Sequence, residues 1–271
     1  LRGRLKKESR LGDKVVIGDR VEVGTGSDGA STIEEVHARR SEIVRRGPGG
    51  RKPKVVAANV DRLVAVAAAA RPEPRQLLLD RLLVIGEANR LDVALVVNKA
   101  DLREDESEAV RLAALYRSIG YPVLETSVVS GDGLHALQDL LCSGTSALVG
   151  PSGVGTSSLL NAIEPGLALR TGALSHKQGR GRHTTVSSRL IPLGCGGLVA
   201  DTPGFSDVGV WGLGQRELEA CFPDFDPFRE ECQFRGCTHF HEPNCGVQAA
   251  LERQEIEESR FESYRSMVAE S

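Results

Sequence analysis

The chain has 271 residues, of which 40% are hydrophobic, and a formal net charge of −3. This length and apolar content suit one main domain with smaller attachments, and the charge argues against a uniformly basic nucleic-acid-binding protein. No apolar run is long enough to cross a bilayer and no charged-then-apolar leader opens the chain, so we expect a soluble cytoplasmic protein with no membrane partner.

The N-terminal part is the basic part. Residues 1–54 hold 14 Lys and Arg against 8 Asp and Glu, so they carry +6 and the remainder carries −9. Short β-branched stretches separated by Gly and Asp turns run from residue 14 to residue 44 and predict a small antiparallel barrel or sheet. Residues 45–54, RRGPGGRKPK, predict a mobile linker or loop. Four arginines lie in or just before this stretch: Arg39, Arg40, Arg45 and Arg46. An exposed basic loop is usually solvated surface, but next to a small barrel it can also bind a phosphate backbone.

The sequence starts at Leu1, and its only methionine is Met267. We therefore expect the native start, and with it part of the first domain, to lie outside this sequence.

Beyond residue 55, apolar strands alternate with longer amphipathic segments. Strands are predicted at residues 62–70, 92–99, 121–127 and 145–150, with helices between them at 76–89, 104–118 and 134–141. This alternation is typical of an α/β fold with a mostly parallel sheet. After Gly214 it stops, and a Cys/His-rich segment leads to a charged helical tail from about Val247. We therefore expect three units, at residues 1–50, 55–215 and 216–271.

A Gly-rich segment, GPSGVGTSSLLNAI from Gly150 to Ile163, follows an apolar strand and opens a helix. Glycines let successive N–H groups turn toward phosphate oxygens, and a helix N-terminus adds partial positive charge. Ser157 occupies the position of the Mg²⁺-binding hydroxyl, but Thr156 replaces the lysine of the pattern. Losing one such electrostatic contact costs roughly 10² to 10³ in rate. In isolation the segment could also be a turn that serves packing alone.

A second motif, Asn98-Lys99-Ala100-Asp101, ends the predicted strand at 92–99. The Asp101 carboxylate can accept hydrogen bonds from guanine N1 and N2, which adenine cannot supply together. After the next strand, Ser127 and Val128 offer backbone contacts to the guanine oxygen. Each short motif alone could be an ordinary strand end.

Downstream, Asp201-Thr202-Pro203-Gly204 follows another apolar strand, where Asp201 can hold Mg²⁺ through water and the Gly204 N–H can meet a γ-phosphate. A cationic loop before it resembles a first switch, in which Thr184 or Thr185 is available to Mg²⁺. Phe205 stands where many GTPases carry a water-orienting Gln, so His183 is our candidate for positioning the attacking water, although a loop histidine is more often a surface residue.

Six cysteines could form three disulfides, but half of them fall in one short window beside histidines, a pattern that favours metal over disulfides. The spacing Cys232-x4-Cys237-x-His239-x5-Cys245 predicts a closed tetrahedral structural zinc site. His241 is close enough to compete with His239, whereas the oxygen ligand Glu242 suits a sulfur-rich site poorly.

With these motifs placed, the sequence closely resembles the ribosome small-subunit-dependent GTPase A family (RsgA, also called YjeQ). The resemblance spans almost the whole chain through RGRLKK, VVIGDRVEV, ANVDRL, NKADL, GPSGVG, GRGRHTT, DTPGF and CQFRGCTHFHEPNCGV. It implies an N-terminal OB-fold β-barrel, here truncated, a circularly permuted P-loop GTPase domain, and a zinc-binding, helical C-terminal domain. It also implies GTP hydrolysis stimulated by the 30S subunit, contacts with 16S rRNA, and a role for His183 in hydrolysis.

The resulting hypothesis is a monomeric GTPase of late 30S maturation that uses one Zn²⁺ and binds Mg²⁺ with GTP or GDP. Ser157, Thr185 and Asp201 are the predicted magnesium residues. The runner-up is an rRNA-binding factor with little or no turnover because of Thr156, and a third possibility is a zinc-dependent RNA-binding module with a vestigial nucleotide site. The predicted nucleotide-binding residues are Asn98, Lys99, Ala100, Asp101, Ser127, Val128, Gly150, Pro151, Ser152, Gly153, Val154, Gly155, Thr156, Ser157, Ser158, Thr184, Thr185, Asp201 and Gly204.

Overall fold

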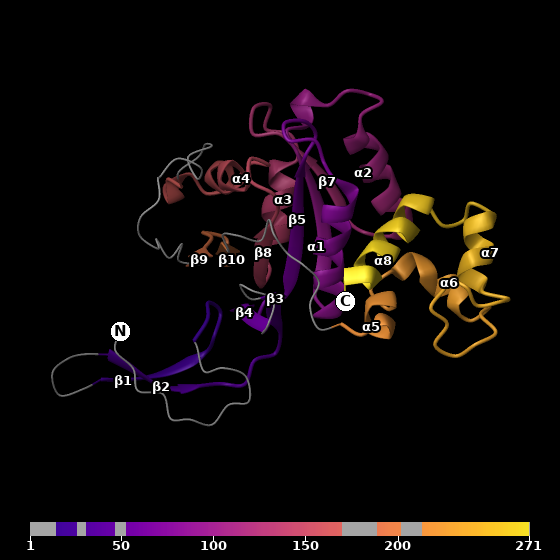
Figure 1. The fold of residues 1–271 in the computed structure, drawn as a ribbon. Helices are drawn as coiled ribbons and strands as arrows, with labels where there is room; N and C mark the ends of the chain where they lie inside the picture. Colours follow the sequence, from indigo (N-terminus) through magenta and orange to yellow (C-terminus); the bar gives the residue numbers. More distant parts are fainter. Residues whose placement is uncertain (1–14, 26–30, 47–52, 170–188, 202–212, 271) are drawn as a thin grey trace, which may run out of the picture.

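The fold was analysed in a computed structural model, which describes residues 15–25, 31–46, 53–169, 189–201 and 213–270 (Figure 1). A central six-stranded sheet carries helices on both faces, a helical unit lies on one side of it, and an N-terminal β segment extends from its lower edge in Figure 1. Within the described residues, no helix has the length and apolar character needed to span a bilayer.

The central sheet has the strand order β7-β6-β5-β8-β10-β9. All neighbouring pairs are parallel except β9 and β10, which form an antiparallel hairpin at one edge. The strands are β5 (Arg62–Ala68), β6 (Asp92–Asn98), β7 (Val123–Thr126), β8 (Thr145–Val149), β9 (Arg189–Pro192) and β10 (Leu198–Asp201). The α/β pattern predicted from the alternation of segments is therefore confirmed.

Successive side chains of the central strand β5 point to opposite faces of the sheet and pack against a different helical layer on each face. Leu63, Ala65 and Ala67 pack with α1 (Gln76–Ala88) and α2 (Glu108–Ile119) in one core. Val64, Val66 and Ala68 pack with α3 (Leu134–Leu141) and α4 (Thr156–Ile163) in the other. Burial on both faces explains why these strands read as continuous apolar runs.

The N-terminal strands form two antiparallel pairs. β1 (Val21–Thr25) pairs with β2 (Ser31–Val36), and β3 (Glu42–Arg46) pairs with β4 (Pro53–Ala58). One bridge, from Ile17 to Ala57, connects the segment before β1 to β4. In the described part of this region the strands make two separate sheets rather than a closed barrel. Ile43 and Ala57 are fully buried in the same core as residues of α1 and α2, so β3 and β4 are anchored to the central domain.

The C-terminal unit consists of short helices around an aromatic core. The elements are α5 (Gln215–Glu219), a 3₁₀ turn at Pro223–Phe225, α6 (Asp226–Arg229), α7 (Gly246–Glu252) and α8 (Glu258–Glu270). Two further 3₁₀ turns, Ala100–Leu102 and Pro165–Leu167, lie in the central domain. The expected helical tail is broken into α7 and α8, and Gln254 between them has φ 59°. In its core Phe222 stacks on Phe225 and Tyr264 meets Phe225 edge-on, and the same core includes Val84 of α1.

A buried ion network fastens this unit to the central domain. The guanidinium of Arg260 on α8 donates to Asp80 of α1 at 2.5 Å and to Asp224 at 2.7 and 3.1 Å. Tyr116 of α2 donates its hydroxyl to Asp80 at 2.7 Å. Burial alone would lower the pKa of Arg260, but the two carboxylates outweigh it and raise that pKa above its usual value. The ring of Phe222 stacks on the guanidinium with its centroid 4.6 Å away.

Candidate nucleotide and metal sites

The predicted base-reading and phosphate-binding motifs meet at the carboxyl edge of the sheet. β6 ends at Asn98 and β8 ends at Val149, one residue before Gly150. In the parallel register, Asn98 lies beside Ala68 and Thr126, and Asp201 of β10 lies beside Leu148. Ligands of open α/β sheets bind at this edge. The ends of five strands, β5, β6, β7, β8 and β10, therefore lie along one edge.

Asn98 is a structural link between the two motifs. Its side chain is 2% exposed, its Nδ2 donates to the carbonyl of Val154 at 2.8 Å, and its Oδ1 accepts from Thr126 Oγ1 at 3.2 Å. A Cβ at Gly155 would lie 2.5 Å from Asn98 Nδ2, and Gly155 has φ 98°. Only glycine fits both the close approach and the left-handed backbone.

Lys99 makes the second link. It adopts φ 60°, and its Nζ donates to the carbonyl of Gly153 at 2.7 Å and to the carbonyl of Arg71 at 2.5 Å. One ammonium group thus joins the base-reading loop, the phosphate loop and the loop between β5 and α1. The lysine is held at the phosphate loop by backbone carbonyls.

Asp101 is exposed and is oriented by its neighbour across the site. Ser127 Oγ donates to Asp101 Oδ1 at 2.5 Å, and the same hydroxyl accepts from the N–H groups of Val129 and Ser130 at 3.1 Å. A carboxylate oxygen retains acceptor capacity after one such bond. Ala100 lies in the turn beside it, and Val128 and Val129 are 39% and 84% exposed on the adjoining loop. The Asp101 carboxylate is therefore exposed, held by Ser127, and still able to accept hydrogen bonds from a ligand.

The predicted phosphate loop joins β8 to α4. Val154 is 1% exposed and anchors its centre, while a Cβ on Gly150 would lie 2.3 Å from the carbonyl of Val66. Ser152 and Gly153 are exposed, and Pro151 opens the loop. α4 begins at Thr156, directly after Gly155, and its first turn also contains Ser157 and Ser158. N–H groups at such a terminus lack helical partners and suit phosphate oxygens.

Asp201, the predicted magnesium residue on β10, is held by Arg189 at the start of β9, with Nε and Oδ2 3.3 Å apart. Both side chains are substantially exposed, at 36% and 57%, so this pair is weak enough to exchange for water or a metal. His183, Thr184, Thr185 and Gly204 fall outside the described residues, and their predicted roles stay predictions.

The Cys/His cluster is assembled as a potential metal site. The ligand atoms of Cys232, Cys237, His239 and Cys245 all lie within 4.8 Å of one another. Cys232 Sγ is 3.9 Å from Cys245 Sγ and 3.7 Å from His239 Nδ1. Tetrahedral Zn–S bonds of about 2.3 Å would place two sulfurs about 3.8 Å apart. The spacing in this chain therefore fits a tetrahedral ion.

Glu219 supports the cluster from outside, and sequence reasoning did not find it. Its Oε1 lies 3.2 Å from His239 Nε2, an arrangement that leaves Nδ1 of His239 facing the sulfurs. Burial alone would raise the pKa of Glu219, but the hydrogen bond from His239 and the charge of Arg229 outweigh it and lower that pKa. Gln248 also contributes, since its N–H approaches Cys245 Sγ at 3.4 Å.

The two other candidate ligands in this segment, His241 and Glu242, do not belong to the cluster. His239 is 2% exposed and belongs to the cluster, whereas His241 is exposed. Glu242 accepts from the N–H of Thr238 at 2.8 Å and from its hydroxyl at 2.5 Å, so it braces the loop instead of facing the sulfurs. These hydrogen bonds overcome the effect of burial and lower the pKa of Glu242.

The preference for metal over disulfides is wrong for one cysteine pair. Cys142 and Cys195 form a disulfide, with Cα atoms 5.4 Å apart. They lie 53 residues apart in sequence and outside the metal cluster. The fold brings the end of α3 to the turn between β9 and β10, which the spacing of cysteines does not reveal.

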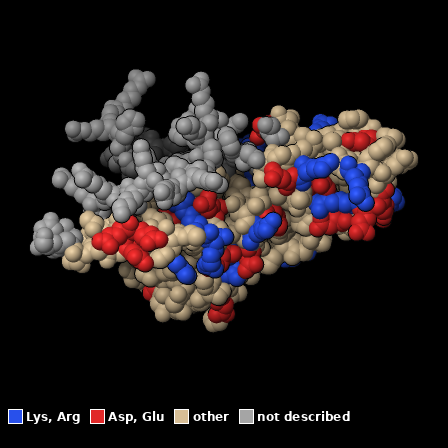
Figure 2. Space-filling model, turned by 90° about the horizontal axis from the view of Figure 1, so that it is seen from below, with Lys and Arg blue, Asp and Glu red and all other residues tan. Residues whose placement is uncertain are grey.

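The described N-terminal strands are not a basic surface. Arg39 is held by Asp19 at 2.6 Å and by Glu42 at 3.1 Å, and the more exposed Arg40 pairs with Asp61 at 3.1 Å. Figure 2 shows acidic side chains gathered toward the end of the molecule where β1 and β2 lie, with basic ones interspersed further along. Most of the positive excess of the first 54 residues falls outside the described part.

Comparison with known proteins agrees with this geometry. The RsgA GTPase family matches residues 36–211. The "Small ribosomal subunit biogenesis GTPase RsgA" of Gemmatimonas aurantiaca is 48% identical and that of Moorella thermoacetica 44% identical, over 97% and 98% of this chain and 87% and 89% of theirs.

Two solved structures share the fold. The crystal structure of YjeQ from Thermotoga maritima has a TM-score of 0.78 at 35% identity and covers 99% of this chain and 88% of its own. The structure of YloQ, described as a circularly permuted GTPase, has a TM-score of 0.72 at 34% identity and covers 96% and 81%. With β6 and its Asn98-Lys99-Ala100-Asp101 motif preceding β8 and its Gly-rich loop, the chain has a circularly permuted GTPase fold and belongs to the RsgA GTPase family.

Proposed function

We propose that this chain binds GTP, hydrolyses it to GDP and phosphate, and acts in maturation of the small ribosomal subunit. The observation that carries the proposal is the direct bonding of Asn98 and Lys99 to the backbone of the phosphate loop. It couples base recognition to phosphate binding within one region. Relatives at up to 48% identity are named GTPases of small-subunit biogenesis, which supports hydrolysis over a binding factor without turnover.

In this proposal Asp101 accepts from guanine N1 and N2, while Ser127 and Val128 border the guanine oxygen. The backbone of residues 150–158 holds the phosphates. The hydroxyls of Ser157 and of Thr184 or Thr185 would hold Mg²⁺, and Asp201 would hold it through water. The bound ion would offset negative charge on the phosphoryl oxygens. His183 positions the attacking water for in-line displacement, and the Gly204 N–H meets the γ-phosphate.

The units on either side of the GTPase domain have proposed roles as well. Residues 1–50 act as a partial OB-fold and, with residues 216–271, contact 16S rRNA, while residues 55–215 form the GTPase domain. Cys232, Cys237, His239 and Cys245 hold one structural Zn²⁺, which the approach of their ligand atoms supports. We further propose that the protein is a cytoplasmic monomer.

The test is multiple-turnover GTP hydrolysis by the zinc-loaded chain, with and without purified 30S subunits. We expect turnover to rise when subunits are added. Loss of the phosphate-binding lysine weakens charge stabilisation, so Thr156→Lys should raise the rate by up to roughly 10². Thr156→Met is the matched control, because it lengthens the side chain without adding charge. If neither the native chain nor Thr156→Lys hydrolyses GTP with subunits present, the chain is not a GTPase.

A further inference from the structure

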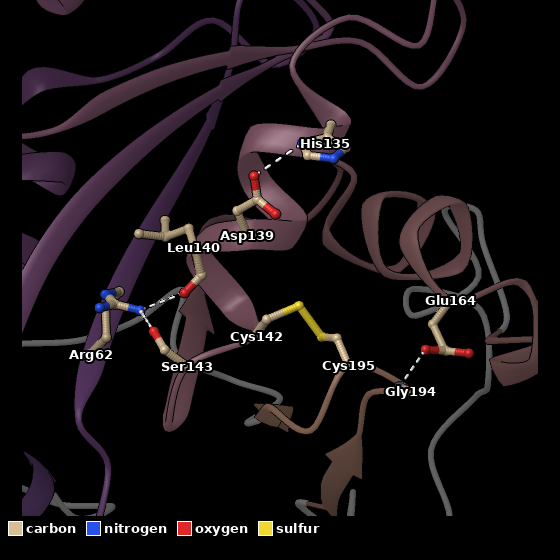
Figure 3. Close-up of a disulfide and its surroundings, with 9 residues drawn as sticks. All are labelled: Arg62, His135, Asp139, Leu140, Cys142, Ser143, Glu164, Gly194 and Cys195. Atoms are coloured by element: carbon tan, nitrogen blue, oxygen red, sulfur yellow. Dashed lines mark hydrogen bonds and ion pairs between the residues drawn. A yellow bond between two sulfur atoms is a disulfide. The ribbon is translucent and has the colours of Figure 1, made fainter.

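A disulfide sits at the far end of the hairpin that carries the proposed magnesium residue. Cys142 directly follows α3, and Cys195 lies in the turn between β9 and β10 (Figure 3). β10 runs from Leu198 to Asp201, so the proposed magnesium residue is at the other end of a four-residue strand. β9 lies at the edge of the sheet and has β10 as its neighbour.

The turn contacts the ends of α3 and α4 without involving sulfur. A Cβ on Gly197 would lie 1.9 Å from the carbonyl of Leu141, so the backbones are in direct contact. Leu198 N–H donates to the carbonyl of Gly144 at 2.9 Å, and Gly194 N–H donates to Glu164 at 2.7 Å. Two thiols at these positions would therefore already be neighbours before any bond forms between them.

The pair also contains the most exposed of the six cysteines. Cys195 is exposed and Cys142 half-buried, whereas Cys221 is 3% exposed and the remaining three cysteines are gathered in the metal cluster. Exposed disulfides are the more easily reduced ones, and thiol oxidation follows access. A small disulfide in solution can reach Cys195 without opening a core.

We propose that Cys142 and Cys195 form a reversible thiol–disulfide exchange site for low-molecular-weight disulfides, and that its closure fixes the β9–β10 hairpin carrying Asp201. The thiolate of one cysteine attacks a disulfide RSSR, forming a mixed disulfide and releasing one RS⁻. The second cysteine, as thiolate, attacks the protein sulfur of that mixed disulfide and releases the other RS⁻. Two protein thiols are oxidised, one RSSR is reduced to two RSH, and their two protons pass to the released thiolates.

Closure has a consequence for nucleotide turnover, and this step rests on the proposed function. The bond ties the hairpin turn to α3, so β10 loses freedom to shift along β8. Asp201 pairs with Leu148 one residue before the end of β8, beside the phosphate loop. A hairpin held in that register keeps Asp201 placed for Mg²⁺. The protein with both cysteines reduced should therefore need a higher Mg²⁺ concentration to reach the same rate.

The experiment incubates the zinc-loaded full chain at graded ratios of oxidised to reduced glutathione, alkylates free thiols and maps the peptides by mass. We expect a Cys142–Cys195 linked peptide that appears and disappears reversibly with the ratio, with zinc content unchanged. Amide hydrogen exchange across residues 189–201 should slow at least threefold on oxidation, and half-maximal turnover should need at least twofold less Mg²⁺. Cys142→Ser and Cys195→Ser should each abolish these responses.

Alkylation of both cysteines at every ratio would overturn the exchange site. A linked peptide with unchanged amide exchange in the hairpin would overturn the fixing of β9–β10. If the chain hydrolyses no GTP in any state, the proposed function fails, while the linked peptide and the amide exchange still decide the redox site. An equal Mg²⁺ requirement in both states of an active protein would overturn the coupling to Asp201.

Discussion

Arg260→Met should strongly destabilise the protein, because it leaves two carboxylates facing each other in the interface between α1 and α8. Arg260 is 1% exposed and Asp80 fully buried, so solvent screens this network little. Removing one partner of a buried ion pair costs about 3 to 5 kcal/mol, against total stabilities of about 5 to 15 kcal/mol. At an m-value of about 3 kcal/mol/M, the urea midpoint should fall by about 1 to 2 M.

The measurement is urea unfolding of the zinc-loaded chain, followed by far-ultraviolet circular dichroism. Arg111→Met is the matched control, since Arg111 pairs with Glu108 on the exposed surface of α2, and its loss should cost below about 1 kcal/mol. Adding Asp80→Asn to Arg260→Met should recover part of the loss, because a neutral amide can still accept from Tyr116. Equal costs for Arg260→Met and Arg111→Met would refute the role assigned to burial.

Three further predictions concern the nucleotide and metal sites. Asp101→Asn replaces an acceptor by a donor and should weaken GTP binding at least 10²-fold while improving binding of xanthosine triphosphate, measured by competition; unchanged preference would remove Asp101 from base recognition. Gly155→Ala places a methyl group 2.5 Å from Asn98 Nδ2 in a left-handed backbone, so the affinity for GDP should fall together with that for GTP. Glu219→Ala removes the partner of His239 Nε2, and zinc affinity measured against a chelator should fall about 10- to 100-fold; an unchanged affinity would show that the carboxylate does not support the metal site.

The sheet and its motif-bearing edge were predictable because local signals coincide there. Strands buried on both faces leave continuous apolar runs, and Asn98 and Gly150 come directly after two such runs. The order of the motifs also predicted the permutation, which the likeness to the circularly permuted GTPase YloQ confirms. What the motifs did not reveal is that Asn98 and Lys99 bond to the phosphate loop, since those contacts join residues more than fifty positions apart.

Other features depend on tertiary placement that leaves no mark in a short window. Glu219 lies 20 residues before His239 and has the composition of an ordinary helical surface residue. Cys142 and Cys195 carry no metal-like spacing, and their pairing follows from the docking of a turn against α3. In the first domain, β1 and β2 lie within the predicted strand region, but β3 extends to Arg46 and β4 begins at Pro53, so both enter the stretch predicted as a linker. Their pairing into two sheets depends on which strands find partners.

The strand order has a consequence for how the chain folds during its own synthesis. β5 lies between β6 and β8, but β8 follows it by roughly 80 residues, whereas β6 follows after one helix. Because the chain is synthesised at about 5 to 20 residues per second, one edge of β5 stays unpaired for roughly 4 to 16 s after it emerges. An apolar, unpaired strand edge invites wrong pairing. The half that carries the predicted base-reading motif is thus made first and must wait for the half that carries the predicted phosphate loop.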